Sequence, residues 1–202
     1  MDKQYLINML KQFAADHKVS VDDEILGQIV SLSSFRVVAK GAIISSLGEN
    51  TDLCGMVISG IVRSYYIDSE GNDITRGFSP PGGMFMDEGC FGYTERICMC
   101  EALEESTIMQ MRVDDFRNIV RSSEKFKDVW IYLLEACCRY KIYRENGFLV
   151  ENATERYVHF KKMYPELSER VPQKHIATYL GIAPESLSRI RSAMKDYETE
   201  ID

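Results

Sequence analysis

From Phe35 onward, the sequence breaks into short apolar stretches separated by glycine, and this pattern limits the folds open to the chain. The stretches read FRVVAK-G-AIISSL-G, then LCGMVIS-G-IVRSYYI, then DITRGF after a turn over residues 68–72. Strands of about five residues between glycine turns predict an antiparallel β structure, either a roll or a barrel. Gly60 stands between two of these strands, which predicts a point where backbones turn or pass closely.

Helical patterns stand before and after the predicted strands. Apolar residues at helical intervals predict two helices within the first 32 residues. Residues 97–111 supply the last one or two strands, and residues 113–120 then predict a short helix. A further amphipathic helix begins after Asn152 and is stopped by Pro165. Helices on both sides of a set of antiparallel strands place the chain in the α+β class.

A longer helix is predicted between residues 123 and 151. Large side chains recur there at alternating steps of four and three residues, the seam of a helix that packs along its length on a partner. This seam predicts a parallel homodimer, and a helix lying on its own domain is the alternative because the pattern covers only about three heptads. The seam residues are Phe126, Trp130, Leu133, Cys137, Tyr140 and Arg144.

The composition and the absence of certain motifs limit where the protein can reside and which chemistry it can carry out. No run of about 18 apolar residues could span a bilayer, and the N-terminal segment lacks the features of a signal peptide, so we expect a cytoplasmic protein with no membrane partner. Six cysteines are then expected as reduced thiols. No C-x-x-C pair is present and the three histidines lie far from Cys98 and Cys100, so we expect no metal site. No phosphate-binding loop or nucleophile elbow is found, and we do not expect an enzyme.

The segment QKHIATYLGIAPESLSRI, residues 173–190, carries the most informative motif. A helix-turn-helix crosses two short helices steeply, so it needs a small residue at the crossing, a glycine in the turn and apolar residues around them. Ala177 supplies the small residue and Gly181 the turn, and Pro184 suits the first turn of the second helix. An ordinary helical hairpin with a solvated face is the alternative.

Polar side chains on both helices are candidates for contacts with double-stranded DNA. Arg189 can pair bidentately with guanine, and Glu185 can accept a hydrogen bond from cytosine. The start of the first helix is placed for phosphates. The candidates for base contacts are Glu185, Ser186, Ser188, Arg189 and Arg191, and those for phosphate contacts are Gln173, Lys174 and His175.

The charge distribution agrees with this interpretation better than the total charge does. The chain has a formal net charge of -7 at pH 7, which by itself argues against a nucleic-acid partner. Residues 152–195, however, contain eight Lys and Arg side chains and four Glu side chains, a net charge of +4. Basic charge is therefore concentrated around the motif.

With β-roll, long helix and C-terminal helix-turn-helix in this order, the chain resembles the Crp/Fnr family of bacterial regulators. The resemblance is carried by GMVISGIVRSYYIDSEGNDITRGFSPPGG and by QKHIATYLGIAPESLSRI. It implies a sensor domain of double-stranded β-helix or jelly-roll type over residues 1–122, a dimerisation helix over 123–151 and a DNA-binding domain over 152–202. It also implies a homodimer that binds two-fold related DNA half-sites under control of the sensor domain, with RNA polymerase as a candidate partner.

The resemblance also bears on the effector. Members of the family that bind cyclic AMP hold the ribose with a glutamate that follows a glycine and the phosphate with an Arg-Ser pair. Arg96 matches the arginine, but Ile97 follows it, and neither Glu88 nor Asp87 follows a glycine. These departures favour a small-molecule effector other than cyclic AMP, or none. Gly83, in a glycine-rich loop that could equally be a plain connection, completes the candidate ligand residues.

The predicted DNA-binding domain departs from the family pattern as well. Ala183 occupies the N-cap position where Ser or Thr is expected, a loss of roughly 1 kcal/mol of helix stability. Six residues follow Asp196, so we expect no β-hairpin wing, and Glu198, Glu200 and Asp202 would repel phosphate. The expected function is a DNA-binding transcription regulator. The alternative is a ligand-binding signalling module whose degenerate helix-turn-helix does not bind DNA.

Overall fold

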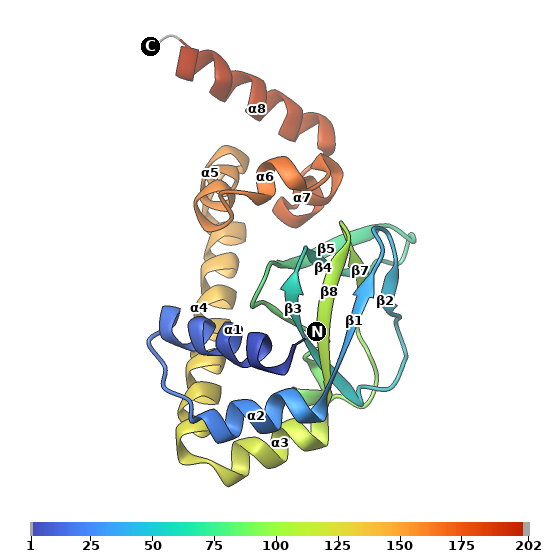
Figure 1. Ribbon diagram of the computed structural model, residues 1–202. Helices are drawn as coiled ribbons and strands as arrows, with labels where there is room; N and C mark the ends of the chain where they lie inside the picture. The colour runs from blue at the N-terminus through green and yellow to red at the C-terminus, as the bar shows by residue number, and fades with distance from the viewer. Residues whose placement is uncertain (1, 200–202) are drawn as a thin grey trace. The chain divides into compact units, whose positions relative to one another are not determined.

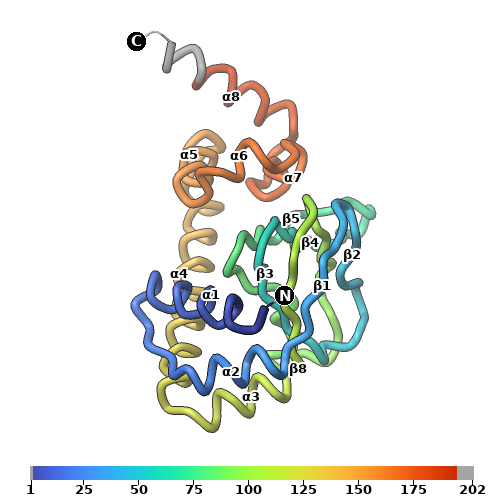
Figure 2. Tube along the Cα trace, in the orientation of Figure 1, coloured from blue at the N-terminus to red at the C-terminus, as the bar shows by residue number. Residues whose placement is uncertain are grey.

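The computed structural model describes residues 2–199, with side chains described as far as Met194. The chain divides into two compact units (Figures 1 and 2), one comprising Met1–Tyr66 and Gly77–Cys138 and the other comprising Ile67–Arg76 and Arg139–Asp202. The acidic residues Glu200 and Asp202 lie outside the described residues. Among residues 2–199, no helix combines the length and the apolar character needed to cross a membrane.

The first unit contains the elements that the sequence predicts for its N-terminal part. Two helices precede the strands and a short helix follows them, so these predictions are confirmed. The elements are α1 (Lys3–Asp16), α2 (Asp23–Leu32), β1 (Ser33–Val38), β2 (Ile43–Ser45), β3 (Leu53–Ser59), β4 (Val62–Ile67), β5 (Asp73–Ser79), β6 (Met84–Phe85), the 3-10 helix η1 (Glu88–Phe91), β7 (Met99–Ala102), β8 (Ser106–Arg112) and α3 (Val113–Ser122).

The strands form two four-stranded sheets, which confirms the predicted antiparallel roll. Their orders are β1-β8-β3-β6 and β2-β7-β4-β5. In the first sheet β8 lies between β1 and β3, with Met109 opposite Phe35 on one side and opposite Met56 on the other. Side chains alternate between the two faces of a strand, so each sheet turns one row of apolar residues towards the other sheet.

Gly60 joins β3 to β4 and behaves as its position in the sequence predicts. Its φ of 89° lies in the left-handed region, where a side chain would be strained. A Cβ at this position would also come within 2.7 Å of the Ser106 Cα. The Ile61 N–H donates to the Ser106 Oγ at 3.2 Å, which holds this turn against the start of β8.

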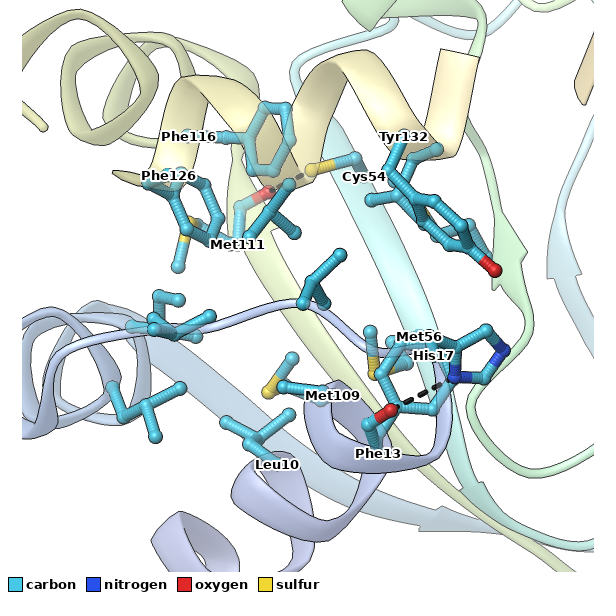
Figure 3. Close-up of a pocket in the computed structure, with 18 of the residues that line it drawn as sticks. Leu10, Phe13, His17, Cys54, Met56, Met109, Met111, Phe116, Phe126 and Tyr132 are labelled. Atoms are coloured by element: carbon cyan, nitrogen blue, oxygen red, sulfur yellow. Dashed lines mark hydrogen bonds between the residues drawn. The ribbon is translucent and has the colours of Figure 1, made fainter. Parts of the chain in front are cut away.

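Two apolar cores stabilise the first unit. One fills the space between the sheets and is built from residues such as Val57, Phe85 and Ile108, all completely buried. The other lies between the first sheet and the helices, where side chains of α1, α2, α3 and the start of α4 meet those of β3 and β8 (Figure 3). The helices therefore cover the outer face of one sheet.

The second unit is helical apart from residues 67–76, which comprise the end of β4, the turn after it and the first half of β5. The long predicted helix is α4 (Glu124–Val150), which has 27 residues and passes from the first unit into the second. Asn152 is the N-cap of the next helix, and its side chain accepts hydrogen bonds from the Thr154 and Glu155 N–H groups. The Glu155 side chain accepts in return from the Asn152 N–H, which completes a capping box. The following helices are α5 (Ala153–Met163), α6 (Leu167–Arg170), α7 (Gln173–Leu180) and α8 (Pro184–Thr199). Helix α6 was not predicted.

Arg144 organises the packing of the second unit. Its guanidinium donates to the Tyr179 carbonyl at 2.8 Å and lies 3.9 Å from the centre of the Tyr179 ring. It also donates to the Arg76 carbonyl in the first half of β5. A hydrogen bond of 2.7 Å between the Thr75 and Thr178 hydroxyls adds a second link between β5 and α7. Residues 67–76 are therefore part of the helical unit.

Candidate functional site

A three-residue turn joins α7 to α8 and sets the angle between these helices. Gly181 ends α7 in the left-handed conformation, with φ of 66° and ψ of 38°, as the sequence predicts for the turn. The Ile182 N–H then donates to the Ala177 carbonyl at 3.0 Å. Ile176, Ala177 and Leu187 are completely buried where the two helices meet. The small side chain of Ala177 lets the backbones approach each other.

The N-terminal half of α8 presents polar side chains to solvent. Glu185, Ser188 and Arg189 are exposed, and Ser186 and Arg191 are partly exposed. Among the side chains described as far as Met194, Arg189 has one hydrogen bond, of 3.3 Å to the Ser186 Oγ, whereas Arg191 donates to the Ser168 carbonyl of α6 at 3.3 Å. The exposed guanidinium of Arg189 therefore has room to change its partner.

The three residues predicted to contact phosphate at the start of α7 differ in their exposure to solvent. Gln173 and Lys174 are exposed at the surface. His175 is buried at 6% exposure, and its Nδ1 lies 4.0 Å from a carboxylate oxygen of Asp73, the first residue of β5. The phosphate contact predicted for His175 would require its ring to leave the interior of the unit. The surface around α7 therefore offers Gln173 and Lys174.

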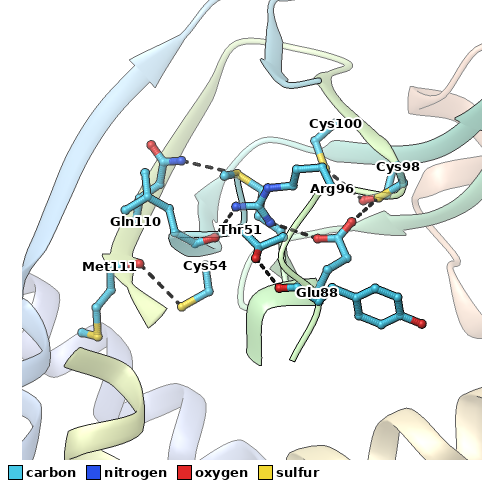
Figure 4. Close-up of polar contacts among 12 residues, drawn as sticks. Thr51, Cys54, Glu88, Arg96, Cys98, Cys100, Gln110 and Met111 are labelled. Carbon is cyan, nitrogen blue, oxygen red and sulfur yellow. Dashed lines mark hydrogen bonds and ion pairs between the residues drawn. The ribbon is translucent and has the colours of Figure 1, made fainter. Parts of the chain in front are cut away.

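Two of the four candidate ligand residues of the β-roll, Glu88 and Arg96, form a closed ion pair (Figure 4). The Arg96 Nη1 donates to the Glu88 Oε2 at 3.0 Å, and the two side chains are 1% and 3% exposed. The Arg96 Nη2 donates to the Leu53 carbonyl. The Cys98 Sγ donates to the other Glu88 oxygen at 2.9 Å. Cys98 was not predicted as part of this site, and the sequence shows no spacing that would have identified it.

The surroundings of Glu88 favour its charged form. Burial by itself raises the pKa of this carboxyl, but hydrogen bonds from Cys98, from the backbone and from Arg96 outweigh that effect. The pKa of Glu88 therefore lies below its ordinary value. At neutral pH the carboxylate and the Arg96 guanidinium face each other as opposite charges.

These residues do not fit a cyclic nucleotide as they stand. A cyclic phosphate would need the Arg96 guanidinium, which the Glu88 carboxylate and a backbone carbonyl already hold. Opening a buried pair leaves charges without partners at a cost of several kcal/mol. Asp87 and Gly83 are half-buried nearby, and the Gly83 N–H already donates to the Pro80 carbonyl at 2.8 Å. The pair acts as an internal support of the roll in this structure.

Helix α4 places the predicted dimer residues against their own chain. Trp130 lies 5.1 Å from Phe116 of α3 between ring centres, and Phe126 lies 6.0 Å from the same ring. The Tyr140 hydroxyl donates to the Tyr179 hydroxyl at 3.3 Å. Leu133 packs against the core, Cys137 is half-buried, and Arg144 holds the second unit together. These contacts favour the alternative in which this seam packs within the protomer.

A different set of α4 residues is exposed. We call Ile131, Cys138, Ile142 and Leu149 the exposed stripe, and its isoleucines and leucine are 53%, 65% and 77% exposed. The spacing of seven, four and seven residues places them on one face of a helix. Glu135 falls on the same face. The stripe is hard to recognise in the sequence because the larger side chains of the neighbouring seam dominate the pattern.

The six cysteines are free thiols. Cys54, Cys98 and Cys100 are buried, as expected for inert thiols, whereas Cys138 is exposed. Within the part of the chain that the structure describes, no three His, Cys, Asp or Glu side chains gather closely enough to hold a metal ion.

Comparison with known proteins identifies the fold. Residues 35–123 match the family model described as the cyclic nucleotide-binding domain. A search of curated proteins finds no match. Among solved structures, FixK2 from Bradyrhizobium japonicum matches with a TM-score of 0.73 and 18% identity over 82% of this chain and 86% of that one.

Two further structures give similar matches. The c-di-GMP-responsive global regulator CLP of Xanthomonas campestris has a TM-score of 0.68 at 14% identity, covering 88% of this chain and 93% of its own. The catabolite activator protein of Thermus thermophilus has a TM-score of 0.56 at 20% identity, covering 89% and 86%. The chain has the cyclic-nucleotide-binding β-roll fold of Crp/Fnr proteins.

Proposed function

We propose that this protein is a DNA-binding transcription regulator whose α8 is the recognition helix of a helix-turn-helix. One observation carries the proposal: Ser188 and Arg189 are exposed on the half of α8 that follows the turn, while Leu187 between the two helices is completely buried. In a helix-turn-helix, this half of the second helix enters the major groove. Burial of the same face would have argued for a helical hairpin without a nucleic-acid partner.

Each exposed side chain suits a particular kind of contact. Arg189 is loosely held and can offer two parallel donors to guanine, and Glu185 can accept from cytosine. Lys174 and Gln173 are positioned at the start of α7 for phosphates. Arg191 is anchored to the Ser168 carbonyl, so we assign it to a fixed phosphate contact instead of a base contact. The net charge of +4 over residues 152–195 supports this surface as the one that meets DNA.

We assign the dimer contact to the exposed stripe of α4. Exposed apolar side chains at heptad-like spacing on a long helix are stabilised by packing on a second copy in parallel orientation. The seam of larger residues is already used within the protomer, which leaves the stripe for the partner. A parallel two-fold dimer would present two recognition helices to a palindromic operator with half-sites about one helical turn apart.

The domain boundaries follow from the same proposal. Residues 1–122 would form the sensor, residues 123–151 the dimerisation helix and residues 152–202 the DNA-binding domain. Two proteins of similar structure support a regulatory role, since CLP is a global regulator that links cell–cell signalling to virulence gene expression and the Thermus thermophilus protein is a catabolite activator. We propose that the chain likewise controls transcription in the cytoplasm.

Selection of bound fragments from a random DNA pool tests the function directly. The full chain should enrich a palindrome, and fluorescence anisotropy should give tighter binding to that fragment than to shuffled DNA of equal length. Affinity should fall steeply with salt because released counterions contribute to binding. No enrichment at low salt, from a protein that is folded by circular dichroism, would favour the signalling module that does not bind DNA.

A further inference from the structure

An apolar cavity lies between the N-terminal helices and the β-roll. Its volume is about 90 Å³, and neither Glu88 nor Arg96 lines it. The walls come from α1, α2, β3, β6, β8, α3 and the start of α4. Figure 3 shows side chains from these elements, including Leu10, Met109 and Phe116, arranged around the cavity.

The lining selects against charge. Carbon and sulfur atoms supply its surface, so a charged group inside would lose its hydration without gaining a partner. Four thioethers contribute, from Met56, Met84, Met109 and Met111. Methionine sulfur makes favourable contacts with aromatic ring edges, and its flexible side chain adapts to different shapes. The lining therefore favours a polarizable, uncharged ring.

Aromatic side chains in the wall reinforce this preference. Phe13, Phe116, Phe126 and Tyr132 lie around the cavity, where a guest ring can take edge-to-face positions. His17 lies 5.8 Å from Tyr132 between ring centres. Its Nδ1 donates to the Phe13 carbonyl at 2.8 Å, so this nitrogen already has its partner within the protein. The ring carbons of His17 therefore join the apolar wall.

We propose that this cavity binds a small uncharged aromatic compound of one ring, such as benzene or a simple phenol. A dry engineered cavity of about 150 Å³ binds benzene. The cavity here is somewhat smaller, and rotation of the lining methionines supplies the remaining space. The bound ring would contact α1, the sheet and α4 at once.

The position of the cavity connects it with the proposed regulation. Val129 and Leu133 of its wall belong to α4, the same helix that carries Ile131 and Cys138 of the exposed stripe. A compound that packs against one side of α4 changes the packing free energy of that helix. The role as effector rests on the proposed function, whereas binding itself does not.

Carbon-13 NMR of the methionine methyl groups tests the binding with phenol or benzene as the probe. Ring currents should shift the resonances of Met56, Met84, Met109 and Met111 in a saturable way, while Met163 and Met194 of the other unit serve as internal references. The assay contains no DNA, so a protein that fails to bind DNA can still pass it. Absence of saturable shifts at the solubility limit of both probes would overturn the proposal, as would shifts of equal size at the two references.

A matched pair of variants tests the location. Ala14 is buried in the cavity wall, whereas the next residue of α1, Ala15, is exposed. The melting temperature of the natural chain should rise by about 3 °C at a probe concentration ten times the Kd. Ala15→Leu should keep this rise and Ala14→Leu should lose it because the added side chain fills the space. If Ala14→Leu does not fold, the methyl shifts alone decide, and a rise kept in a folded Ala14→Leu variant would refute the site.

Discussion

The guanidinium of Arg96 donates to the carboxylate of Glu88 across 3.0 Å, and both side chains are withdrawn from solvent. The pair joins η1 to the segment before β7, and the Leu53 carbonyl ties it to β3. Three separate parts of the roll therefore meet at one buried charge pair. Arg96, which the resemblance to cyclic-AMP-binding proteins implied as a phosphate ligand, therefore stabilises the fold in this structure.

Removal of one partner of the pair should be more damaging than removal of both. Arg96→Met leaves the Glu88 carboxylate buried without its counter-ion, and we expect a loss of about 3–5 kcal/mol of unfolding free energy. The double variant Arg96→Met/Glu88→Gln should be more stable than the single variant. Urea unfolding followed by the fluorescence of Trp130, the single tryptophan of the chain, reports on the first unit. Equal stability of the single and double variants would contradict a charge interaction.

The same pair should make the first unit sensitive to acid. The pKa of Glu88 lies below its ordinary value in the folded chain, so the unfolded chain binds the proton more tightly. The resulting stabilisation is complete above the unfolded pKa of about 4.3 and is lost as the pH falls through the lower folded value. Glu88→Gln should be less stable than the natural chain at pH 7, and the difference should shrink towards pH 3. A difference independent of pH would argue against an ionised Glu88.

Cyclic AMP should not stabilise the protein. The arginine that would hold its phosphate is already paired, and Ile97 replaces a hydroxyl donor. At millimolar cyclic AMP we expect the melting temperature to change by less than about 1 °C, because a ligand stabilises only in proportion to its occupancy. Differential scanning fluorimetry measures this directly. A saturable rise of several degrees would mean that the ion pair opens for the nucleotide.

Two substitutions should separate base contacts from phosphate contacts. Arg189→Ala should relax the preference at one base pair in each half-site and cost about 1–3 kcal/mol on the selected palindrome. Lys174→Ala should weaken binding to all sequences alike and reduce the slope of affinity against salt by about one. Anisotropy titrations on the palindrome and on a variant base pair measure both effects. Sequence preference that is indifferent to Arg189 would refute the assignment of α8 as the recognition helix.

Neighbouring cysteines on α4 can identify the dimer face. In a parallel dimer through the exposed stripe, the two copies of Cys138 face each other, and opposing seam positions lie within disulfide reach. Mild oxidation should therefore link two chains in the natural protein and in Cys137→Ser, but not in Cys138→Ser. Non-reducing gel electrophoresis shows the linked species. Cross-linking that depends on Cys137 would instead restore the seam of larger side chains as the interface.

Much of the fold follows from local sequence patterns. Gly60 and Gly181 were predicted as turn residues, and both have positive φ. Asn152 was predicted to interrupt the helices, and it caps α5. Such features depend on a few neighbouring residues, whose backbone preferences and hydrogen bonds are largely independent of the rest of the chain. The antiparallel strands and the two helices of the motif were predicted for the same reason.

Only the tertiary structure shows whether a side chain packs inside the protein or faces solvent. Helix α4 has apolar residues on more than one face, so the pattern alone could not show that Trp130 packs inward while Ile131 is exposed. The sequence predicts His175 at the surface of a helix start, yet it is buried beside Asp73 of β5. The sequence by itself determined the antiparallel strands, the turns at Gly60 and Gly181, and every described helix longer than one turn, because these depend on local backbone preferences and periodicity. The pairing of Arg96 with Glu88 is visible only in the tertiary structure. Long-range packing decides whether a buried charge meets a counter-ion of the same chain or stays available to a ligand.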